Sequence, residues 1–249
     1  MGLTRTFFNT TSVDGIHVKA VIPFKKKGAK SRLAQLLTAA EREEFALCML
    51  KDVLRALASS AIDELEIIAT GVEPEQIRAV ARAATVNSSA LTIRQDDREL
   101  NEALNEVLAR ERAPLLIVMA DVPLVTPESI NRIIAHDEAV VIVPGRKGGT
   151  NALFLRTPSA FTVSYYGMSF REHLAIAQQR QLSHAVYDSF FISTDIDEVE
   201  DLVELLIHGS GFSTAYLQRI DVGLAVDKAA KTRAWVERRT ATAAKSETF

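Results

Sequence analysis

The chain has 249 residues, of which 24% are charged and 47% hydrophobic, and its formal net charge is −3. That length can form one α/β domain with a sizeable core, and the near-neutral charge argues against a nucleic-acid or membrane-surface partner. The single cysteine, Cys48, cannot form an internal disulfide, and its apolar helical neighbours indicate a buried structural residue rather than a nucleophile.

The amino terminus shows no targeting signal. Residues 1–17 lack the basic start and apolar core of a signal peptide, and no run of about 18 apolar residues could span a bilayer. We therefore expect a cytoplasmic protein whose residues 1–17 form a flexible leader.

Strands and helices alternate along the chain from residue 18 onward. The expected strands cover residues 18–23, 65–70, 90–93, 115–120, 139–143 and 152–155, with a further strand end at Ile192. The expected helices cover residues 39–58, 74–83, 100–109, 170–179 and 199–207, and another begins at Pro127. Thr38 and Glu41 form a capping box before the first of these helices.

This alternation predicts a doubly wound α/β fold with a mostly parallel central sheet flanked by helices. The strand over residues 115–120 is apolar on both faces, as at the centre of a parallel sheet. We expect one domain over residues 18–210, followed by an extension over residues 211–249 to which the sequence assigns no role.

The loop after the first strand is strongly basic and includes Lys25, Gly28, Lys30 and Arg32. Glycine lets a backbone approach a ligand closely, and the cations can neutralise phosphates. The loop has neither Walker A nor GxGxxG spacing, so a solvated basic turn is an equally good interpretation of the run by itself.

Three aspartates lie where strands are expected to end. Asp121 follows the central strand directly, and Asp195 and Asp197 are spaced to face one way on an extended segment. Carboxylates at such positions can hold a hard divalent cation that bridges phosphates, while Asp197 could equally cap the following helix.

Two glycine-containing loops are candidates for binding a second anion. Gly149, Thr150 and Asn151 belong to one, and Ser169 begins a helix in the other, although an ordinary helix cap would also explain Ser169. His173 follows Ser169 by one helical turn and could reach the same ligand or pack internally. HExxH, zinc-ligand spacing and a Ser/His/Asp order are absent, which disfavours hydrolase and zinc chemistry.

Six motifs together resemble the 2-phospho-L-lactate guanylyltransferases of coenzyme F(420) biosynthesis. They are VIPFK (21–25) leading to AKSRL (29–33), LNEALN (100–105), ADVPL (120–124), GGTNAL (148–153), YGMSF (166–170) with His173, and DID (195–197) with EDL (200–202). The resemblance runs in order from about Val18 to Gly209.

The resemblance implies a Rossmann-like GT-A nucleotidyltransferase that transfers GMP from GTP to (2S)-2-phospholactate. It implies that Asp121, Asp195 and Asp197 hold Mg²⁺ or Mn²⁺. It also implies that Lys30 and Arg32 act on the GTP phosphates, with Lys25, Gly28, Leu100 and Asn101 near the nucleotide. It further implies that Thr150, Gly167 and Ser169 bind the phosphate of the acceptor. Gly149, Asn151 and His173 are expected to bind the acceptor beside them. Separately, the apolar residues Phe190 and Phe191 lie outside the expected core elements, and from them we expect a homodimer.

Several alternatives stay open at this point. Phosphoenolpyruvate or 3-phosphoglycerate could replace phospholactate as the acceptor, because a single unsaturation separates phosphoenolpyruvate from phospholactate. A sugar-phosphate or molybdopterin nucleotidyltransferase would share the fold, and a regulator could bind GTP without catalysis.

Overall fold

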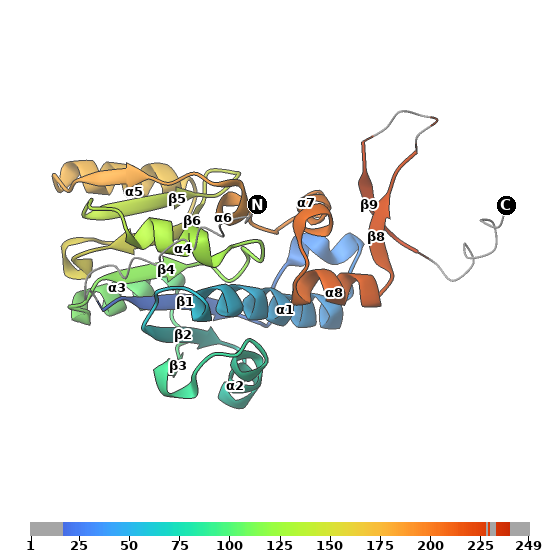
Figure 1. Cartoon of the computed structure of the whole chain (residues 1–249), viewed down its shortest axis with the longest axis horizontal. Coiled ribbons are helices and arrows are strands. Elements are labelled where there is room, and N and C mark those ends of the chain that lie inside the picture. Colours follow the sequence, from blue (N-terminus) through green and yellow to red (C-terminus); the bar gives the residue numbers. More distant parts are fainter. Residues whose placement is uncertain (1–16, 228, 230–232, 240–249) are drawn as a thin grey trace, which may run out of the picture.

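The central feature of the computed structural model, which describes residues 17–227, 229 and 233–239, is a seven-stranded sheet of order β3-β2-β1-β4-β6-β5-β7 (Figure 1). Its strands are β1 (Lys19–Lys25), β2 (Glu64–Thr70), β3 (Leu91–Gln95), β4 (Leu115–Val118), β5 (Val140–Pro144), β6 (Thr150–Leu155) and β7 (His184–Val186). Only β6 pairs antiparallel to its neighbours within this sheet. The predicted mostly parallel sheet is therefore confirmed.

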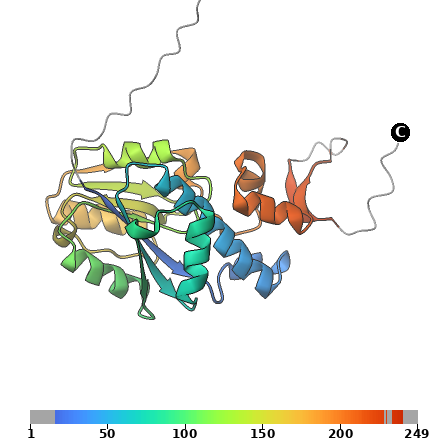
Figure 2. The same ribbon diagram turned by 60° about the horizontal axis from the view of Figure 1, so that its bottom comes forward.

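Helices cover both faces of the sheet (Figure 2). The helices α1 (Ala39–Ala58), α2 (Pro74–Ala83) and α4 (Pro127–Ile134) pack in one apolar cluster, and α3 (Leu100–Arg110) and α5 (Ser169–Gln179) pack in another. Strand β4 supplies Leu116 and Val118 to the first cluster and Leu115 and Ile117 to the second. Period-two alternation between two apolar layers explains why this strand is a continuous hydrophobic run.

Two local predictions are corrected by the structure. Ile192 is not a strand end but lies in the short helix α6 (Phe190–Ser193), where the Thr194 hydroxyl donates to the Phe190 carbonyl over 2.6 Å. The edge strand β7 precedes it and was not predicted, because three residues are too few to show a periodic pattern. Thr150 and Asn151, expected in a loop, already belong to β6.

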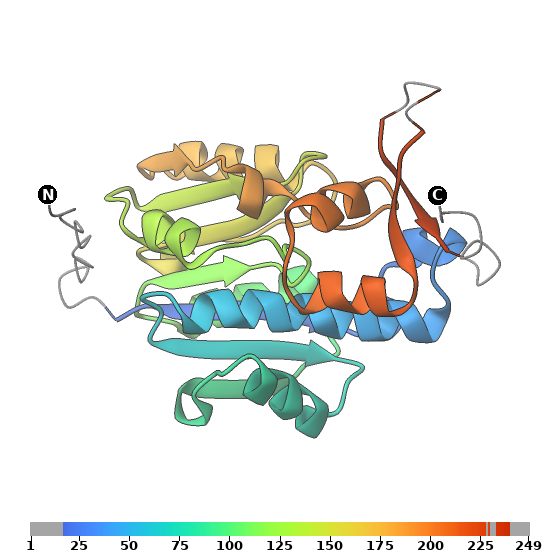
Figure 3. The same cartoon turned by 45° about the vertical axis from the view of Figure 1, so that its right-hand side comes forward.

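The segment after residue 200 packs along the length of α1, from Arg238 against Glu41 in its first turn to Phe212 against Arg55 in its last. It forms α7 (Asp201–His208), α8 (Phe212–Arg219) and a hairpin of β8 (Val222–Ala225) with β9 (Trp235–Arg238). Figure 3 shows α8 lying along α1, with the hairpin beyond it. Within the ranges that the structure describes, no helix has the length and apolarity to cross a bilayer.

A buried carboxylate on α1 joins α8 to the rest of the protein. Asp52, whose side chain is 1% exposed, accepts hydrogen bonds from the Phe212 and Ser213 amides at 2.8 and 2.9 Å and from the Ser213 hydroxyl at 2.6 Å. A Cβ added to Gly211 would overlap the Asp52 carboxylate, so glycine at this position allows the close approach. Asp52 thus supplies the N-terminal cap that α8 lacks in its own sequence.

We expect Asp52→Ala to lower the free energy of unfolding by about 2–4 kcal/mol, because it leaves buried amide donors without an acceptor. Urea unfolding followed by circular dichroism measures the change. The matched control is Asp137→Ala, since the Asp137 side chain is fully exposed. Equal stability of the two variants would contradict the capping role.

Candidate active site

The candidate site lies where β1 and β4 end side by side. The two strands are parallel neighbours, so their carboxyl ends meet at one edge of the sheet, the edge where α/β proteins bind ligands. Lys30 follows β1 and Asp121 follows β4. The Ile196 amide donates to the Asp121 carbonyl over 2.9 Å and so brings the third segment, with Asp197, to the same place.

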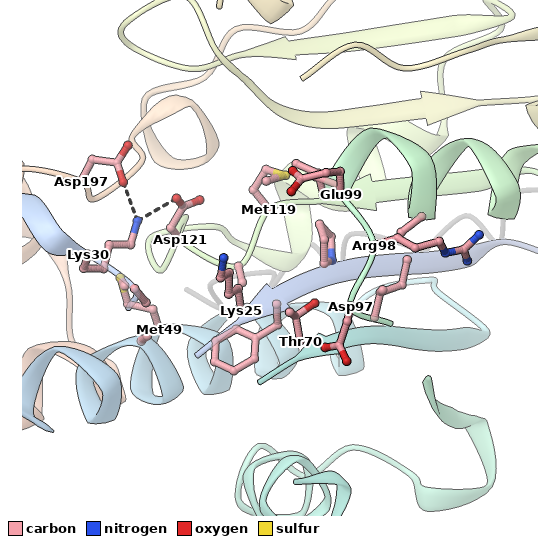
Figure 4. Close-up of a pocket in the computed structure, with 18 of the residues that line it drawn as sticks. Lys25, Lys30, Met49, Thr70, Asp97, Arg98, Glu99, Met119, Asp121 and Asp197 are labelled. Carbon is pink, nitrogen blue, oxygen red and sulfur yellow. Dashed lines mark hydrogen bonds and ion pairs between the residues drawn. The ribbon is translucent and has the colours of Figure 1, made fainter. Parts of the chain in front are cut away.

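Lys30 bridges two of the predicted aspartates (Figure 4). Its Nζ lies 2.8 Å from Asp121 Oδ2 and 2.7 Å from Asp197 Oδ1, and its side chain is only 9% exposed. Burial disfavours the charged ammonium, but the carboxylates of Asp121 and Asp197 outweigh it and raise the pKa of Lys30. Burial likewise opposes ionisation of Asp197, and Lys30 outweighs it and lowers the pKa of that carboxyl.

The backbone of Lys30 adopts an unusual conformation. It sits in the left-handed region at φ 53° and ψ 42°, immediately before the short 3-10 helix η1 (Ser31–Gln35). A lysine in this region has a conformational cost of order 1 kcal/mol or more, which the surrounding structure must offset. The two ion pairs that hold the ammonium in place provide that compensation.

The third predicted aspartate is placed apart from the other two. Asp195 Oδ1 accepts from the Arg146 amide at 3.2 Å and from Asn151 Nδ2 at 3.3 Å, and so fastens the loop before β6. Among the described residues, no group of three or more His, Cys, Asp or Glu side chains is arranged to hold a metal ion. Of the three predicted aspartates, Asp121 and Asp197 share one cationic partner, the ammonium of Lys30.

These two carboxylates nevertheless suit a magnesium ion. Mg²⁺ commonly takes one or two protein carboxylates and completes its shell with water and substrate phosphates. Asp121 and Asp197 are 27% and 34% exposed, and both border the open cleft. Asp195 is engaged through Oδ1 with the loop before β6 and is not grouped with them, so the three-aspartate assignment stays a prediction.

A cleft of about 500 Å³ opens beside Lys30, a volume typical of small-molecule sites. Phe24, Ala46, Met49, Ile68, Leu100 and Ala103 supply its apolar walls, and Lys25, Thr70, Asp97 and Glu99 are polar groups along it. The Lys25 side chain makes no hydrogen bond or ion pair with any described residue, so its ammonium is available to an anion in the cleft (Figure 4). Of the residues predicted near the nucleotide, Lys25, Lys30 and Leu100 line this cleft.

The other residues predicted for the nucleotide lie elsewhere. Arg32 is 63% exposed and reaches Asp197 at 3.5 Å from outside the cleft lining. Gly28 occupies an exposed turn at φ +72° with open space around it. Asn101 does not line the cleft, because its Oδ1 accepts the Tyr165 amide at 2.7 Å.

The residues predicted for the acceptor's phosphate form a second group. Thr150 begins β6 and Ser169 begins α5, and the Ser169 hydroxyl donates to Thr150 Oγ1 over 3.3 Å. Gly167 is exposed at φ +68° between Tyr166 and Met168, and Gly149 has open space where a side chain would be. Thr150, Ser169 and the two glycines are thus brought together by the meeting of β6 and α5.

His173 and Asn151 are placed differently from the prediction of direct substrate contact. His173 is 0% exposed, and its two ring nitrogens are bonded to Thr150 Oγ1 at 2.9 Å and the Ser164 amide at 3.0 Å. Burial in this setting lowers the pKa of His173 to about 4, so the ring is neutral. The Asn151 amide is also buried and donates to the Ile192 carbonyl at 3.0 Å.

Two features of the site were missed in the sequence. Tyr166 donates its phenol to Glu99 over 2.6 Å, and both residues border the cleft. Asp201 Oδ2 accepts the Asp197 and Glu198 amides at 2.9 and 2.8 Å and so shapes the loop that carries Asp197. Asp201 belongs to the EDL motif (200–202). Its role of accepting backbone amides three and four residues earlier in the chain could not be read from the sequence, because no distinctive spacing marks it.

Known proteins of one family match most of this chain. The model of the family described as guanylyl transferase CofC like matches residues 18–239, which includes α8 and the hairpin beyond the expected domain end at residue 210. The 2-phospho-L-lactate guanylyltransferase of Methanosarcina mazei is 46% identical over 201 residues, covering 81% of this chain and 92% of that protein. The enzyme of the same name from Methanoregula boonei is 45% identical over 208 residues, covering 84% and 91%.

Solved structures show the same fold at low identity. A nucleotidyl transferase from Methanothermobacter thermautotroptrophicus superposes with a TM-score of 0.55 at 15% identity, covering 82% of this chain and all of that one. The 4-diphosphocytidyl-2C-methyl-D-erythritol synthase of Anaerococcus prevotii gives 0.54 at 13% identity, covering 83% and 98%. The predicted nucleotidyltransferase fold is confirmed, and by the extent of the family match and the identity to its relatives this chain belongs to the guanylyl transferase CofC-like family.

Proposed function

We propose that this protein transfers GMP from GTP to 2-phospho-L-lactate, giving lactyl-2-diphospho-5′-guanosine and diphosphate. The observation that carries the proposal is the Lys30 ammonium held between Asp121 and Asp197 at the mouth of a nucleotide-sized cleft. The family membership and the names of its 45–46% identical relatives support the choice of GTP and of a phosphorylated lactate.

The chemistry requires positioning rather than a protein base. An oxygen of the acceptor's phosphate forms a bond to the α-phosphorus of GTP, the bond from that phosphorus to the β-phosphate oxygen breaks, and diphosphate leaves. The attacking phosphate is already anionic, so no proton has to be removed. This is the pattern of phosphoryl-transfer enzymes, in which orientation and charge stabilisation supply most of the acceleration.

The main obstacle is repulsion between the two polyanionic substrates. Each pair of unit negative charges 4 Å apart repels by about 4 kcal/mol at an effective dielectric constant of 20. Lys30 is fixed by its two ion pairs, and the Lys25 ammonium in the same cleft is unpaired among the described residues, so both cations can offset phosphate charge in this proposal.

A divalent ion would be held by Asp121 and Asp197 in this proposal, with Asp195 as a third, more distant candidate. When bound, it would neutralise phosphate charge and favour departure of diphosphate. Lys30 already keeps the two carboxylates oriented toward one point, so the protein maintains a cation-binding geometry from its own residues.

A panel of nucleotides and acceptors tests the proposed function. With GTP and Mg²⁺, phospholactate is expected to release diphosphate and form a product whose mass equals phospholactate plus GMP. ATP, CTP and UTP should give at most about a tenth of the rate. Faster reaction with phosphoenolpyruvate or 3-phosphoglycerate would change the acceptor, and reaction only with a sugar phosphate or molybdopterin would overturn the proposal.

GTP binding without diphosphate release from any acceptor would instead indicate a non-catalytic regulator. The predicted homodimer needs a separate measurement, by light scattering on the purified protein. Phe190 packs inside the chain against Phe191 and His208, so of the two phenylalanines that motivated it only Phe191, 40% exposed, offers an apolar surface.

A further inference from the structure

We propose that His173 is a positioning residue that forces the Thr150 hydroxyl to donate its proton to the acceptor's phosphate. The inference rests on the proposed function, because it takes Thr150 to face that phosphate. It assigns to His173 a role behind the ligand site rather than in contact with the ligand. The hydroxyls of Thr150 and Ser169 and the imidazole of His173 are all buried and bonded to one another.

The hydrogen bond from the Ser164 amide determines the tautomer of His173. The Ser164 amide can only donate, and it points at His173 Nε2 over 3.0 Å, so Nε2 must be the unprotonated acceptor. A neutral imidazole then carries its proton on Nδ1. The Nδ1–H group faces Thr150 Oγ1 at 2.9 Å and donates to it.

The Thr150 hydroxyl has two hydrogen-bond partners in the protein. A threonine oxygen has two lone pairs and one proton. One lone pair accepts from His173 Nδ1 and the other accepts from the Ser169 hydroxyl at 3.3 Å. Both acceptor positions are filled, so the Thr150 proton can only be donated. No protein acceptor within hydrogen-bond reach takes it among the described residues, so it remains for an anionic ligand.

Aromatic rings and backbone hydrogen bonds hold His173 and Ser164 in place. His173 lies between the rings of Phe161 and Tyr165, with centroids 5.9 and 5.0 Å away. Ser164 is in turn kept in place by its neighbours in the chain. Asn105 pairs with both the amide and the carbonyl of Val163 at 2.8 and 3.2 Å, and Asn101 accepts the Tyr165 amide at 2.7 Å.

These contacts also connect the two substrate regions. Asn101 and Asn105 belong to α3, whose first residue Leu100 lines the cleft, while Thr150 and Ser169 lie on the acceptor side. A partly buried row of hydrogen bonds therefore runs from α3 through residues 163–165 and His173 to Thr150. Such a hydrogen-bonded network keeps a hydroxyl oriented at little cost when the ligand arrives.

Two amide substitutions separate the functions of the two ring nitrogens. Asparagine can place an N–H donor near the position of Nδ1, and glutamine can place an acceptor near Nε2 but no donor at Nδ1. We expect His173→Gln to raise the KM for the acceptor about tenfold or more, as loss of one charge-assisted hydrogen bond would, while the KM for GTP stays within twofold. His173→Asn should keep the acceptor KM within about threefold of the wild type.

Substitution of Thr150 tests the same proton from the other side. Thr150→Val keeps the shape and removes the hydroxyl, and it should raise the acceptor KM at least as much as His173→Gln. Thr150→Ser keeps the hydroxyl and should reverse most of the increase in acceptor KM that Thr150→Val causes. Equal acceptor KM values in the glutamine and asparagine variants, or equal effects on both substrates, would overturn the positioning role, because a purely structural defect would not discriminate.

Nitrogen-15 NMR of the imidazoles provides a readout that does not depend on turnover. The wild-type ring of residue 173, identified by its absence in His173→Asn, should show a protonated Nδ1 and an unprotonated Nε2 between pH 6 and 8. A proton on Nε2 would refute the inference. Absence of turnover with every phospho-acid would instead defeat the proposed function, while the tautomer measurement would still decide on His173.

Discussion

Replacing Asp121 by alanine is expected to lower kcat for guanylyl transfer by on the order of 10³-fold while leaving the protein folded. The substitution removes one of the two carboxylates that hold the Lys30 ammonium and that would hold a divalent ion beside the phosphates. Lys30 keeps its ion pair with Asp197, so the thermal unfolding temperature should change by only a few degrees. Steady-state assays of diphosphate release with GTP and phospholactate measure the loss.

The control for this variant removes an equivalent carboxylate far from the cleft. Asp137→Ala deletes an exposed side chain that makes only a surface ion pair with Arg156 at 3.7 Å. Surface pairs of this kind contribute roughly 0–1 kcal/mol, so activity should be unchanged. If Asp121→Ala retained more than about a tenth of the wild-type kcat, the assignment of Asp121 to the catalytic centre would fail.

Lys30→Met is expected to lower kcat/KM for GTP by roughly 10²–10³-fold. Methionine keeps most of the length of the side chain but removes the cation that bridges Asp121 and Asp197, and the two carboxylates then repel each other and the incoming phosphates. Lys27→Met, an exposed lysine of the same loop outside the cleft lining, serves as the matched control and should stay within twofold of the wild type. Comparable kcat/KM values in both variants would show that the loop acts only through its net charge.

The same substitution has a predictable effect on stability as a function of pH. The folded pKa of Lys30 is raised above its ordinary value of 10.5, so its contribution is complete below that pH and is lost as the pH rises through the folded pKa. The folded pKa of Asp197 is lowered below 3.8, so its contribution is present above that pH and is lost as the pH falls through the folded pKa. The stability difference between wild type and Lys30→Met should therefore be constant from about pH 5 to pH 10 and shrink in acid.

Urea unfolding at pH 3, 5, 7 and 9 measures this difference. A gap that grew in acid would contradict the ion-pair assignment, because protonation of Asp197 weakens its pairing with Lys30 in the wild type and relieves its repulsion with the neighbouring carboxylate in the variant. Restoring a cation with Lys30→Arg should recover part of the stability but less of the activity, because a planar guanidinium does not reproduce a compact ammonium.

Much of the scaffold follows from local sequence. The capping box at Thr38 and Glu41 begins α1 as predicted, with the Thr38 hydroxyl accepting the Glu41 amide and the Glu41 carboxylate accepting the Thr38 amide. The run at residues 115–118 became a central buried strand, because unbroken hydrophobicity is stable only between two apolar layers. Asp121 was predicted at the site because a polar residue directly after such a strand must lie at its carboxyl end.

Other parts could not be read from local patterns. Strand β7 and helix α6 have three and four residues, too few to show a periodic hydrophobic pattern. Strand β6 runs antiparallel although its sequence resembles that of the parallel strands. The capping of α8 depends on Asp52, which precedes Ser213 by 161 residues. Because no local motif marks this acceptor, the sequence could not show that α8 packs on α1.

The sequence by itself determined the alternating α/β architecture, the family and the set of residues at the strand ends, because these depend on periodicity and on ordered motifs. Only the tertiary structure decided which of those residues contact one another. It placed Lys30 against Asp197, 167 residues away, directed Asp195 toward Asn151, and buried His173 behind Thr150. The physical reason is that hydrogen bonds and ion pairs depend on distances of about 3 Å between side chains, which sheet pairing and helix packing set.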